Sequence, residues 1–296
     1  MAIEAFISYL SHEKKYSAHT VKAYQKDLND FSAFCENEYQ LKDIDGVSYP
    51  IIRNWIVNLV DLNISNRSVN RKVTSLKSYY KFLMKTGNLK GNPLAKHKAL
   101  KTAKKIEIPF SEAEMAKLLN ELPFENSFEG VRDRLIIELF YATGIRRSEL
   151  INLGLKDVDL SNRTLKVLGK RNKERIVPLL ESTIRLFNEY FNLRKEVENA
   201  GFSDAVFLTS KGNKIYETLV YRIINGYFSK VSSKVKKSPH ILRHTFATHM
   251  LNQGADLNSV KELLGHSSLA STQVYTHNSI AELKKVHSKA HPRNRK

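Results

Sequence analysis

The sequence predicts a mainly α-helical protein with one small antiparallel sheet, an α+β class, arranged as an N-terminal helical bundle and a second, C-terminal domain. The chain has 296 residues and 42% hydrophobic residues, enough to bury two cores. Apolar residues recur at spacings of three and four along most of the chain, which is typical of amphipathic helices. Two short segments flanking a polar turn are the clearest strands, so the sheet is expected to be small.

The first 97 residues predict a bundle of four amphipathic helices joined by tight connections. An apolar stripe begins at Ile3, and Ser17 is expected to cap the second helix. A third helix over about 51–60 follows Pro50, and a fourth covers about 65–85.

From position 91 to 109 the sequence G-N-P-L-A-K-H-K-A-L-K-T-A-K-K-I-E-I-P loses its helical stripe and gains lysines. We therefore predict a bundle over 1–97, a basic linker over 98–109 and a second domain over 110–296. Three lysines of this linker are candidates to follow a nucleic-acid backbone: Lys101, Lys104 and Lys105. The alternative is that they only keep a linker extended and soluble.

In the second domain a strongly apolar helix is expected over 132–142, broken by Gly144. Residues 164–168 and 175–179 alternate or cluster as strands around the turn G-K-R-N-K-E. They predict an antiparallel hairpin with Lys170 at its tip.

Further along, residues 206–213 suggest another strand and turn. A helix is expected over 241–252, and Asp256 should cap the next one, which Gly265 ends. A tail over 280–296 begins as a helix too short to fold alone.

The balance of charge indicates a polyanionic partner. Forty-eight Lys and Arg against thirty Asp and Glu give a net charge of +18. On the bundle, Arg67, Arg71 and Lys72 fall outside the apolar stripes and are candidate phosphate contacts. The alternatives are a merely basic protein and ordinary solvated helix faces. Membrane-surface binding is disfavoured, because the basic residues are not collected on one amphipathic helix.

Location and covalent chemistry are also constrained. No long apolar run or cleavable leader is present, so we expect a cytoplasmic protein. One cysteine, Cys35, excludes an internal disulfide and a cysteine-based zinc site. His240, His244 and His249 share one segment, but H-E-x-x-H is absent, so we predict no metal and interpret the latter two as packing residues.

Several residue types suited to phosphate chemistry stand near predicted helix ends. His240 and Arg243, three apart, share the N-terminal face of one helix, where backbone N–H groups favour an anion. Each candidate has a structural explanation when taken singly. Together the candidates form one constellation: Arg146, Lys170, His240, Arg243, His266 and Tyr275.

That order of residues resembles a known family. The motifs are A-T-G-I-R-R-S-E-L (142–150), G-K-R-N-K-E-R-I-V-P-L (169–179), S-P-H-I-L-R-H-T-F-A-T-H-M-L (238–251) and L-G-H-S-S-L-A-S-T-Q-V-Y-T-H (264–277). They are similar to those of the tyrosine recombinase (phage integrase) family, and within it to the Xer-type site-specific recombinases. Two departures are Arg171, where many relatives have glycine, and Arg147, where they often have an apolar residue.

The resemblance implies roles for the six residues. Arg146 and Arg243 would hold the scissile phosphate, and Lys170 would protonate the leaving 5′ oxygen. His240 and His266 would assist proton transfer, and Tyr275 would be the nucleophile. A 3′-phosphotyrosyl intermediate, with no metal or nucleotide cofactor, would follow.

The resemblance also implies partners and a biological role. The implied partner is duplex DNA with specific recombination sites. On that DNA the chain would form a homo- or hetero-tetramer whose protomers exchange their tails. A paralogous recombinase and a septal DNA translocase are further candidate partners. We expect chromosome or plasmid dimer resolution, in chromosome partition at cell division. The alternatives are DNA integration by a mobile element and relaxation by a type IB-like topoisomerase.

Overall fold

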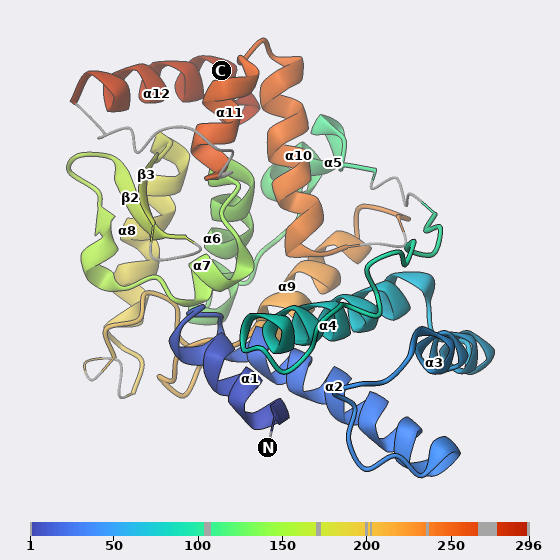
Figure 1. The fold of residues 1–296 in the computed structure, drawn as a ribbon. Helices are drawn as coiled ribbons and strands as arrows, with labels where there is room; N and C mark the ends of the chain where they lie inside the picture. The colour runs from blue at the N-terminus through green and yellow to red at the C-terminus, as the bar shows by residue number, and fades with distance from the viewer. Residues whose placement is uncertain are drawn as a thin grey trace. The chain divides into compact units, whose positions relative to one another are not determined.

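The chain forms two compact units, Met1–Lys105 and Ile106–Lys296 (Figure 1). The computed structural model describes residues 2–103, 108–169, 173–198, 201, 203–234, 237–265 and 277–294, and only the backbone of 277–282. The division falls inside the segment predicted as a linker, whose limits of 98–109 stay a prediction.

The described part of the first unit contains four helices, as predicted. They are α1 (Ala2–His12), α2 (Ala18–Tyr39), α3 (Tyr49–Asp61) and α4 (Asn66–Lys85). The Ser17 hydroxyl caps α2 by accepting a hydrogen bond from the Thr20 N–H, and Ser65 caps α4 in the same way. Pro50 stands in the first turn of α3, where its missing N–H costs no hydrogen bond. Phe6, Phe31 and Trp55 are among the buried core residues.

The first residues of the predicted linker are attached to this bundle. Asn70 forms two hydrogen bonds with the backbone of Leu100, each of 2.9 Å. Asn66 donates to the Lys101 carbonyl at 2.8 Å. Residues up to 101 are therefore held by the side chains of α4.

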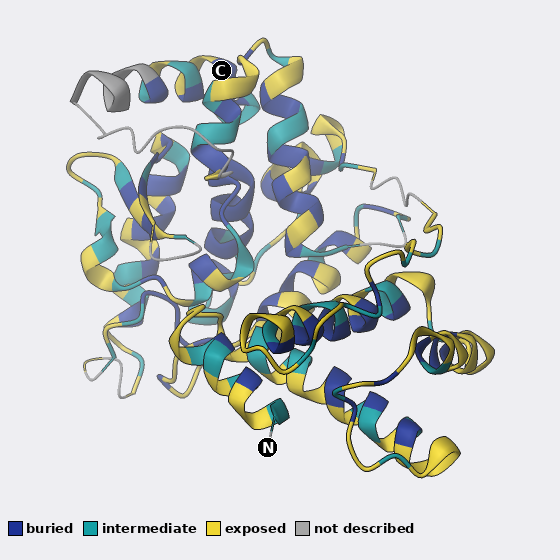
Figure 2. Cartoon of the chain, in the orientation of Figure 1, coloured by how far each residue is buried: buried dark blue, intermediate teal, exposed yellow. Residues whose placement is uncertain are grey.

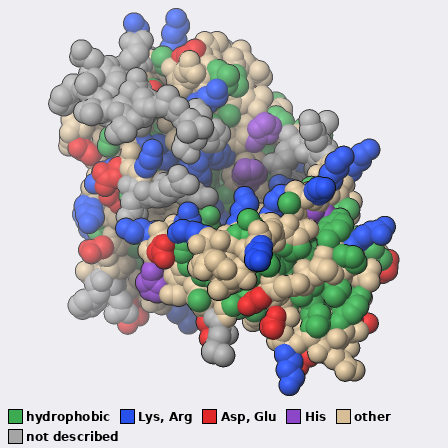
Figure 3. Space-filling model, viewed as in Figure 1, with side chains coloured by type: hydrophobic (Ala, Val, Ile, Leu, Met, Phe, Trp, Pro, Cys, Tyr) green, Lys and Arg blue, Asp and Glu red, His purple; other side chains and the backbone are tan. Residues whose placement is uncertain are grey.

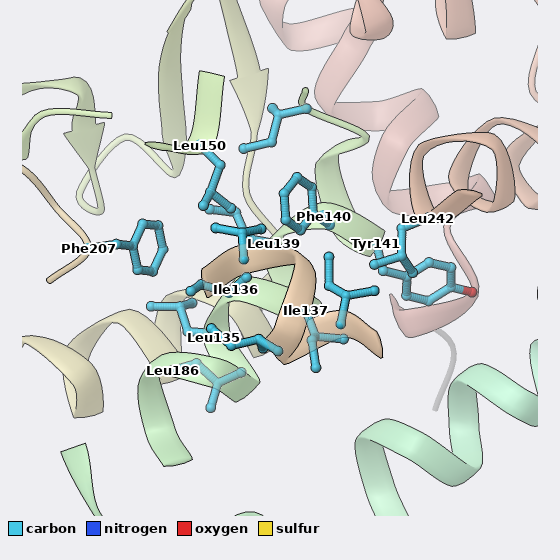
Figure 4. Close-up of a cluster of buried hydrophobic side chains, with 14 of the residues drawn as sticks. Leu135, Ile136, Ile137, Leu139, Phe140, Tyr141, Leu150, Leu186, Phe207 and Leu242 are labelled. Carbon is cyan, nitrogen blue, oxygen red and sulfur yellow. The ribbon is translucent and has the colours of Figure 1, made fainter. Parts of the chain in front are cut away.

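The second unit is built around one buried helix. Its helices are α5 (Glu112–Ala116), continued by a π-helical turn (Lys117–Glu121), α6 (Phe128–Thr143), α7 (Arg147–Ile151), α8 (Glu181–Arg194), α9 (Glu217–Ser229), α10 (Pro239–Asn252), α11 (Leu257–Leu264) and α12 (His277–Ala290), with 3₁₀ turns at Leu155–Asp157 and Pro292–Asn294. Most of α6 is buried (Figure 2), and its side chains from Leu135 to Tyr141 pack with Leu150, Leu186 and Phe207 (Figure 4). This helix carries the loop that leads into α7.

The predicted hairpin is confirmed as β2 (Thr164–Leu168) and β3 (Glu174–Pro178), which pair antiparallel. A two-residue strand, β1 (Val158–Asp159), adds to the other side of β2, so the sheet has the order β1-β2-β3. The predicted fold class, helices with one small antiparallel sheet, is correct.

Of the strand and turn predicted over 206–213, the strand is wrong and the turn is present. The Gly212 N–H donates to the Thr209 carbonyl at 3.0 Å, and the Thr209 N–H donates to the Asn213 carbonyl at 2.7 Å. Residues there form only isolated bridges, Gly154 to Ala205 and Leu208 to Lys214. Side chains occupy the backbone groups that a strand ladder would use: Tyr190 donates to the Val206 carbonyl and accepts from the Leu208 N–H. The apolar run is therefore buried as a loop fixed by side chains.

The C-terminal helices end where the sequence indicates. Asp256 caps α11 by accepting from the Asn258 and Ser259 N–H groups, and Gly265 ends it in the left-handed conformation at φ +62°. The helix predicted over 241–252 begins earlier, at Pro239, because proline is favoured in a first helical turn.

The tail is docked on its own unit. His287 donates from Nε2 to the Ala142 carbonyl at 2.6 Å, and His291 donates to the Tyr141 carbonyl at 2.9 Å. Leu283 and Ala290 are buried with Phe246 of α10. The end of α6 is thus covered by the chain's own C-terminus.

Candidate active site

Arg146 is positioned by the loop that ends α6. Gly144 adopts φ +61°, and a Cβ there would lie 2.5 Å from Cδ1 of Phe246, so only glycine fits. Arg146 follows as the N-cap residue of α7. Its backbone N–H and its Nη1 each donate to the Glu149 carboxylate at 2.7 Å. About a third of the Arg146 side chain is exposed, so the guanidinium is fixed at one edge and open at another.

Arg243 is held from inside the unit. It comes from the first turns of α10, is buried, and donates to the carbonyls of Gly144 and Leu264 at 2.6 Å each. Those carbonyls stand at the C-terminal ends of α6 and α11, where the helix dipole attracts a cation. Arg146 also donates to the Gly265 carbonyl at 3.2 Å. The two arginines are therefore anchored to adjacent residues at the end of α11.

A third guanidinium belongs to the same cluster. Arg175 of β3 donates to both oxygens of Glu149, at 3.0 and 2.9 Å, and to the Leu263 carbonyl at 2.9 Å. Arg175 is not among the six site residues predicted from the sequence. One signal was present: Arg175 stands two residues before the core residue Val177 in a strand, on the same face, which places a charge on the buried side.

The charges of this cluster favour an anion. Burial disfavours the Glu149 carboxylate, but its bonds to Arg175 and Arg146 outweigh burial and lower its pKa to about 2. Burial, together with the neighbouring charges of Arg146 and Arg175, lowers the pKa of Arg243 to about 10, so it stays protonated at neutral pH. The cluster thus contains three guanidiniums and one carboxylate, of which Arg146 and Arg175 bind the carboxylate directly, so positive charge is in excess.

The other predicted site residues have different outcomes. His240 lies in the first turn of α10, exposed, one helical turn before Arg243. His244 is exposed, so its interpretation as a packing residue is wrong, whereas His249 is buried and forms a 2.9 Å hydrogen bond with the Tyr141 hydroxyl. Lys170, His266 and Tyr275 lie outside the described residues.

The cations predicted to contact phosphates from the bundle and from the linker do not share one environment. Arg67 and Lys101 are exposed. Arg71 is ion-paired with the buried carboxylate of Asp27 but keeps half of its side chain exposed. Lys104 and Lys105 lie outside the described residues.

The expectation that Lys72 lies outside the apolar stripe is wrong. Its side chain is about 10% exposed, and Nζ lies 3.3 Å from Asp27 and 2.5 Å from Asp30. Because Asp27 is buried in α2, a cation on α4 must reach inward to balance it. Lys72 therefore joins the two helices.

The described ranges contain no cluster of three or more His, Cys, Asp or Glu side chains able to hold a metal ion. No helix among them is long and apolar enough to span a membrane. Lys and Arg side chains are visible on the surface of both units in Figure 3.

Comparisons with known proteins identify the family. Residues 109–282 match the Phage integrase family, and residues 3–87 match the Phage integrase, N-terminal SAM-like domain. Among relatives, the chain is 39% identical to tyrosine recombinase XerC of Chlorobaculum parvum, over 98% of this chain and 94% of that protein. It is 40% identical to tyrosine recombinase XerC of Staphylococcus haemolyticus, over 98% and 97% of the two chains.

A solved structure gives the same fold. It is the XerH site-specific recombinase in a post-cleavage complex with a palindromic difH substrate, with a TM-score of 0.73 and 21% identity over 97% of this chain and 83% of that one. The resemblance drawn from the sequence motifs is confirmed, and the chain belongs to the phage integrase family.

Proposed function

We propose that this chain is a site-specific DNA recombinase that cleaves and rejoins DNA through a covalent phosphotyrosine. The observation that supports it most directly is the anchored pair Arg146 and Arg243. Each guanidinium is fixed by carbonyls at the end of α11, and one carboxylate balances only part of the positive charge. A phosphate diester is an anion whose non-bridging oxygens match planar guanidinium donors.

In the proposed step, the Tyr275 oxygen attacks the scissile phosphorus and the bond from phosphorus to the 5′ oxygen breaks. Lys170 gives a proton to that leaving oxygen, and His240 and His266 assist removal of the proton that the Tyr275 phenol gives up. Arg146 and Arg243 stabilise the negative charge that grows on the phosphoryl oxygens. A phenol with a pKa of ~10 is about one part in a thousand ionised at neutral pH, a handicap of about 4 kcal/mol that nearby cations reduce.

Rejoining reverses the same step. A 5′ hydroxyl attacks the phosphotyrosine, the ester bond to Tyr275 breaks, and the phenol regains a proton. Since the energy of the cut bond is kept in the ester, no nucleotide hydrolysis is needed.

The test is covalent trapping on a nicked DNA substrate that loses its 5′ fragment after cleavage. The parent chain should give a protein–DNA adduct that resists denaturation, and Tyr275→Phe should give none while still binding DNA. An adduct formed by Tyr275→Phe would refute the assignment of the nucleophile.

We further propose that the enzyme resolves chromosome or plasmid dimers in the cytoplasm, as a tetramer on two DNA sites, with a paralogue and a septal translocase as candidate partners. The XerC relatives support a recombinase of this type. Plasmids with two sites test the proposal, because recombination changes their connectivity, whereas a topoisomerase only removes supercoils.

The tail provides a route for communication between protomers. We propose that residues 280–296, whose described part docks on its own unit in this structure, exchange onto a neighbour when the tetramer assembles on DNA. Their removal is expected to reduce recombination more than DNA binding. Unchanged recombination by the truncated chain would contradict the exchange.

A further inference from the structure

Three consecutive carbonyls at the C-terminal end of α11 each accept a hydrogen bond from a different arginine. The Leu263 carbonyl accepts from Arg175 at 2.9 Å, the Leu264 carbonyl from Arg243 at 2.6 Å and the Gly265 carbonyl from Arg146 at 3.2 Å. The last carbonyls of a helix have no partner inside it, so they must be satisfied from outside. One helix end thereby fixes the spacing of three guanidiniums.

Arg175 is the least exposed of the three arginines, and each of its three side-chain nitrogens donates to a protein group. Its side chain is 4% exposed, and its three donor nitrogens contact Glu149 twice and the Leu263 carbonyl once. It is therefore in no position to touch DNA. Its stem also packs against Gly265, where a Cβ would lie 3.0 Å from Cδ of Arg175.

The partner that Arg175 shares with Arg146 gives it influence over the phosphate site. Glu149 is 3% exposed, and its carboxylate receives donors from both arginines. Without Arg175, Arg146 would be the one arginine still hydrogen-bonded to Glu149, and the net charge of that pair would be zero. With Arg175 present, Glu149 orients Arg146 without neutralising it.

We propose that Arg175 is a positioning residue for DNA cleavage. It balances Glu149 so that Arg146 stays available to the scissile phosphate, and it fixes the end of α11 immediately before His266. This inference rests on the proposed role of Arg146 in holding that phosphate.

The test compares Arg175→Met with the parent chain on two trapping substrates. One has the natural scissile phosphate, and the other has a neutral methylphosphonate at the same position. We expect Arg175→Met to slow covalent trapping on the phosphate by about 10- to 100-fold, the usual range for a residue that supports a site through another group. The ratio of parent to variant rates should fall on the methylphosphonate, because less negative charge needs to be stabilised. An equal ratio on both substrates would refute the electrostatic role.

A double variant tests the sharing of charge directly and guards against simple loss of folding. Glu149→Gln removes the carboxylate charge but keeps an acceptor for Arg146, so adding it to Arg175→Met should restore part of the rate. A double variant that is no faster than Arg175→Met would overturn the proposal. Arg175→Lys should remain slow, since one ammonium cannot reproduce the paired donors to Glu149. Parent-like cleavage by this variant would also overturn it.

Two controls separate this inference from the proposed function. Lys166→Met removes an exposed, ion-paired cation of the same hairpin and should cleave normally. Arg146→Met reports on the proposed function, which fails if that variant cleaves normally. Slow Arg146→Met with normal Arg175→Met would refute only the role of Arg175.

Discussion

Replacing Gly144 by alanine should destabilise the second unit, Ile106–Lys296, and slow the proposed cleavage reaction. The residue has φ +61°, and an added Cβ would lie 2.5 Å from Phe246 and 2.8 Å from Leu264, both of them buried. A left-handed non-glycine residue costs about 1–2 kcal/mol. Overpacking a well-filled core adds about 1–3 kcal/mol. We therefore expect a total loss of about 2–5 kcal/mol in the free energy of unfolding.

Gly254 offers a matched control in the same unit. It also has a positive φ, of +86°, but nothing lies within 4 Å of an added Cβ. Gly254→Ala should cost only the backbone contribution, about 1–2 kcal/mol. The two variants therefore differ in their expected free energy of unfolding. That difference, divided by a urea m-value of about 2 kcal/mol per molar, predicts urea unfolding midpoints that differ by on the order of 1 M.

Urea unfolding followed with two probes would measure this. The single tryptophan, Trp55, is in the first unit, so its fluorescence should give the same transition in all three proteins. Far-UV circular dichroism would in addition follow the unfolding of the helices of the second unit. Equal losses in Gly144→Ala and Gly254→Ala would refute the packing argument.

The same variant tests the site. The Gly144 carbonyl accepts from Arg243, so displacing this loop should misplace the guanidinium. We expect Gly144→Ala to form the covalent adduct at least about 10-fold more slowly, because small errors in catalytic geometry are costly. An unchanged rate would show that the carbonyl does not orient Arg243.

Two other predictions concern the tail and the bundle. Burial lowers the pKa of His287 to about 4 and that of His291 well below the ordinary 6.5, so docking of α12 requires neutral imidazoles. Docking of α12 should be complete above about pH 6.5 and weaken as the pH falls toward 4. Amide hydrogen exchange in α12, corrected for the intrinsic pH dependence of exchange, would measure this weakening. Protection that stays constant over this pH range would refute the prediction. Lys72→Met should destabilise the bundle by about 1–3 kcal/mol in the Trp55 transition, since the buried Asp27 carboxylate loses one of its charged partners. Arg67→Ala should instead leave stability unchanged, weaken DNA binding and reduce its salt dependence by about 0.9 in log–log slope. Equal stability effects from the two changes would contradict the assignment of Lys72 as a buried cation.

The sequence by itself determined the helices, the hairpin, the family and the list of candidate catalytic residues. These follow from short-range patterns: Ser17, Asp256 and Gly265 mark helix ends through hydrogen bonds and backbone angles within a few residues. Such patterns act locally, so they remain legible without knowledge of the rest of the chain.

Only the tertiary structure decided which charges are buried and what they bind. Arg175 meets Glu149 across 26 positions and the Leu263 carbonyl across 88, and Lys72 turns inward to Asp27 across 45. No local pattern encodes those partners, because the cost of burying a charge is settled by groups that folding brings together from distant parts of the chain.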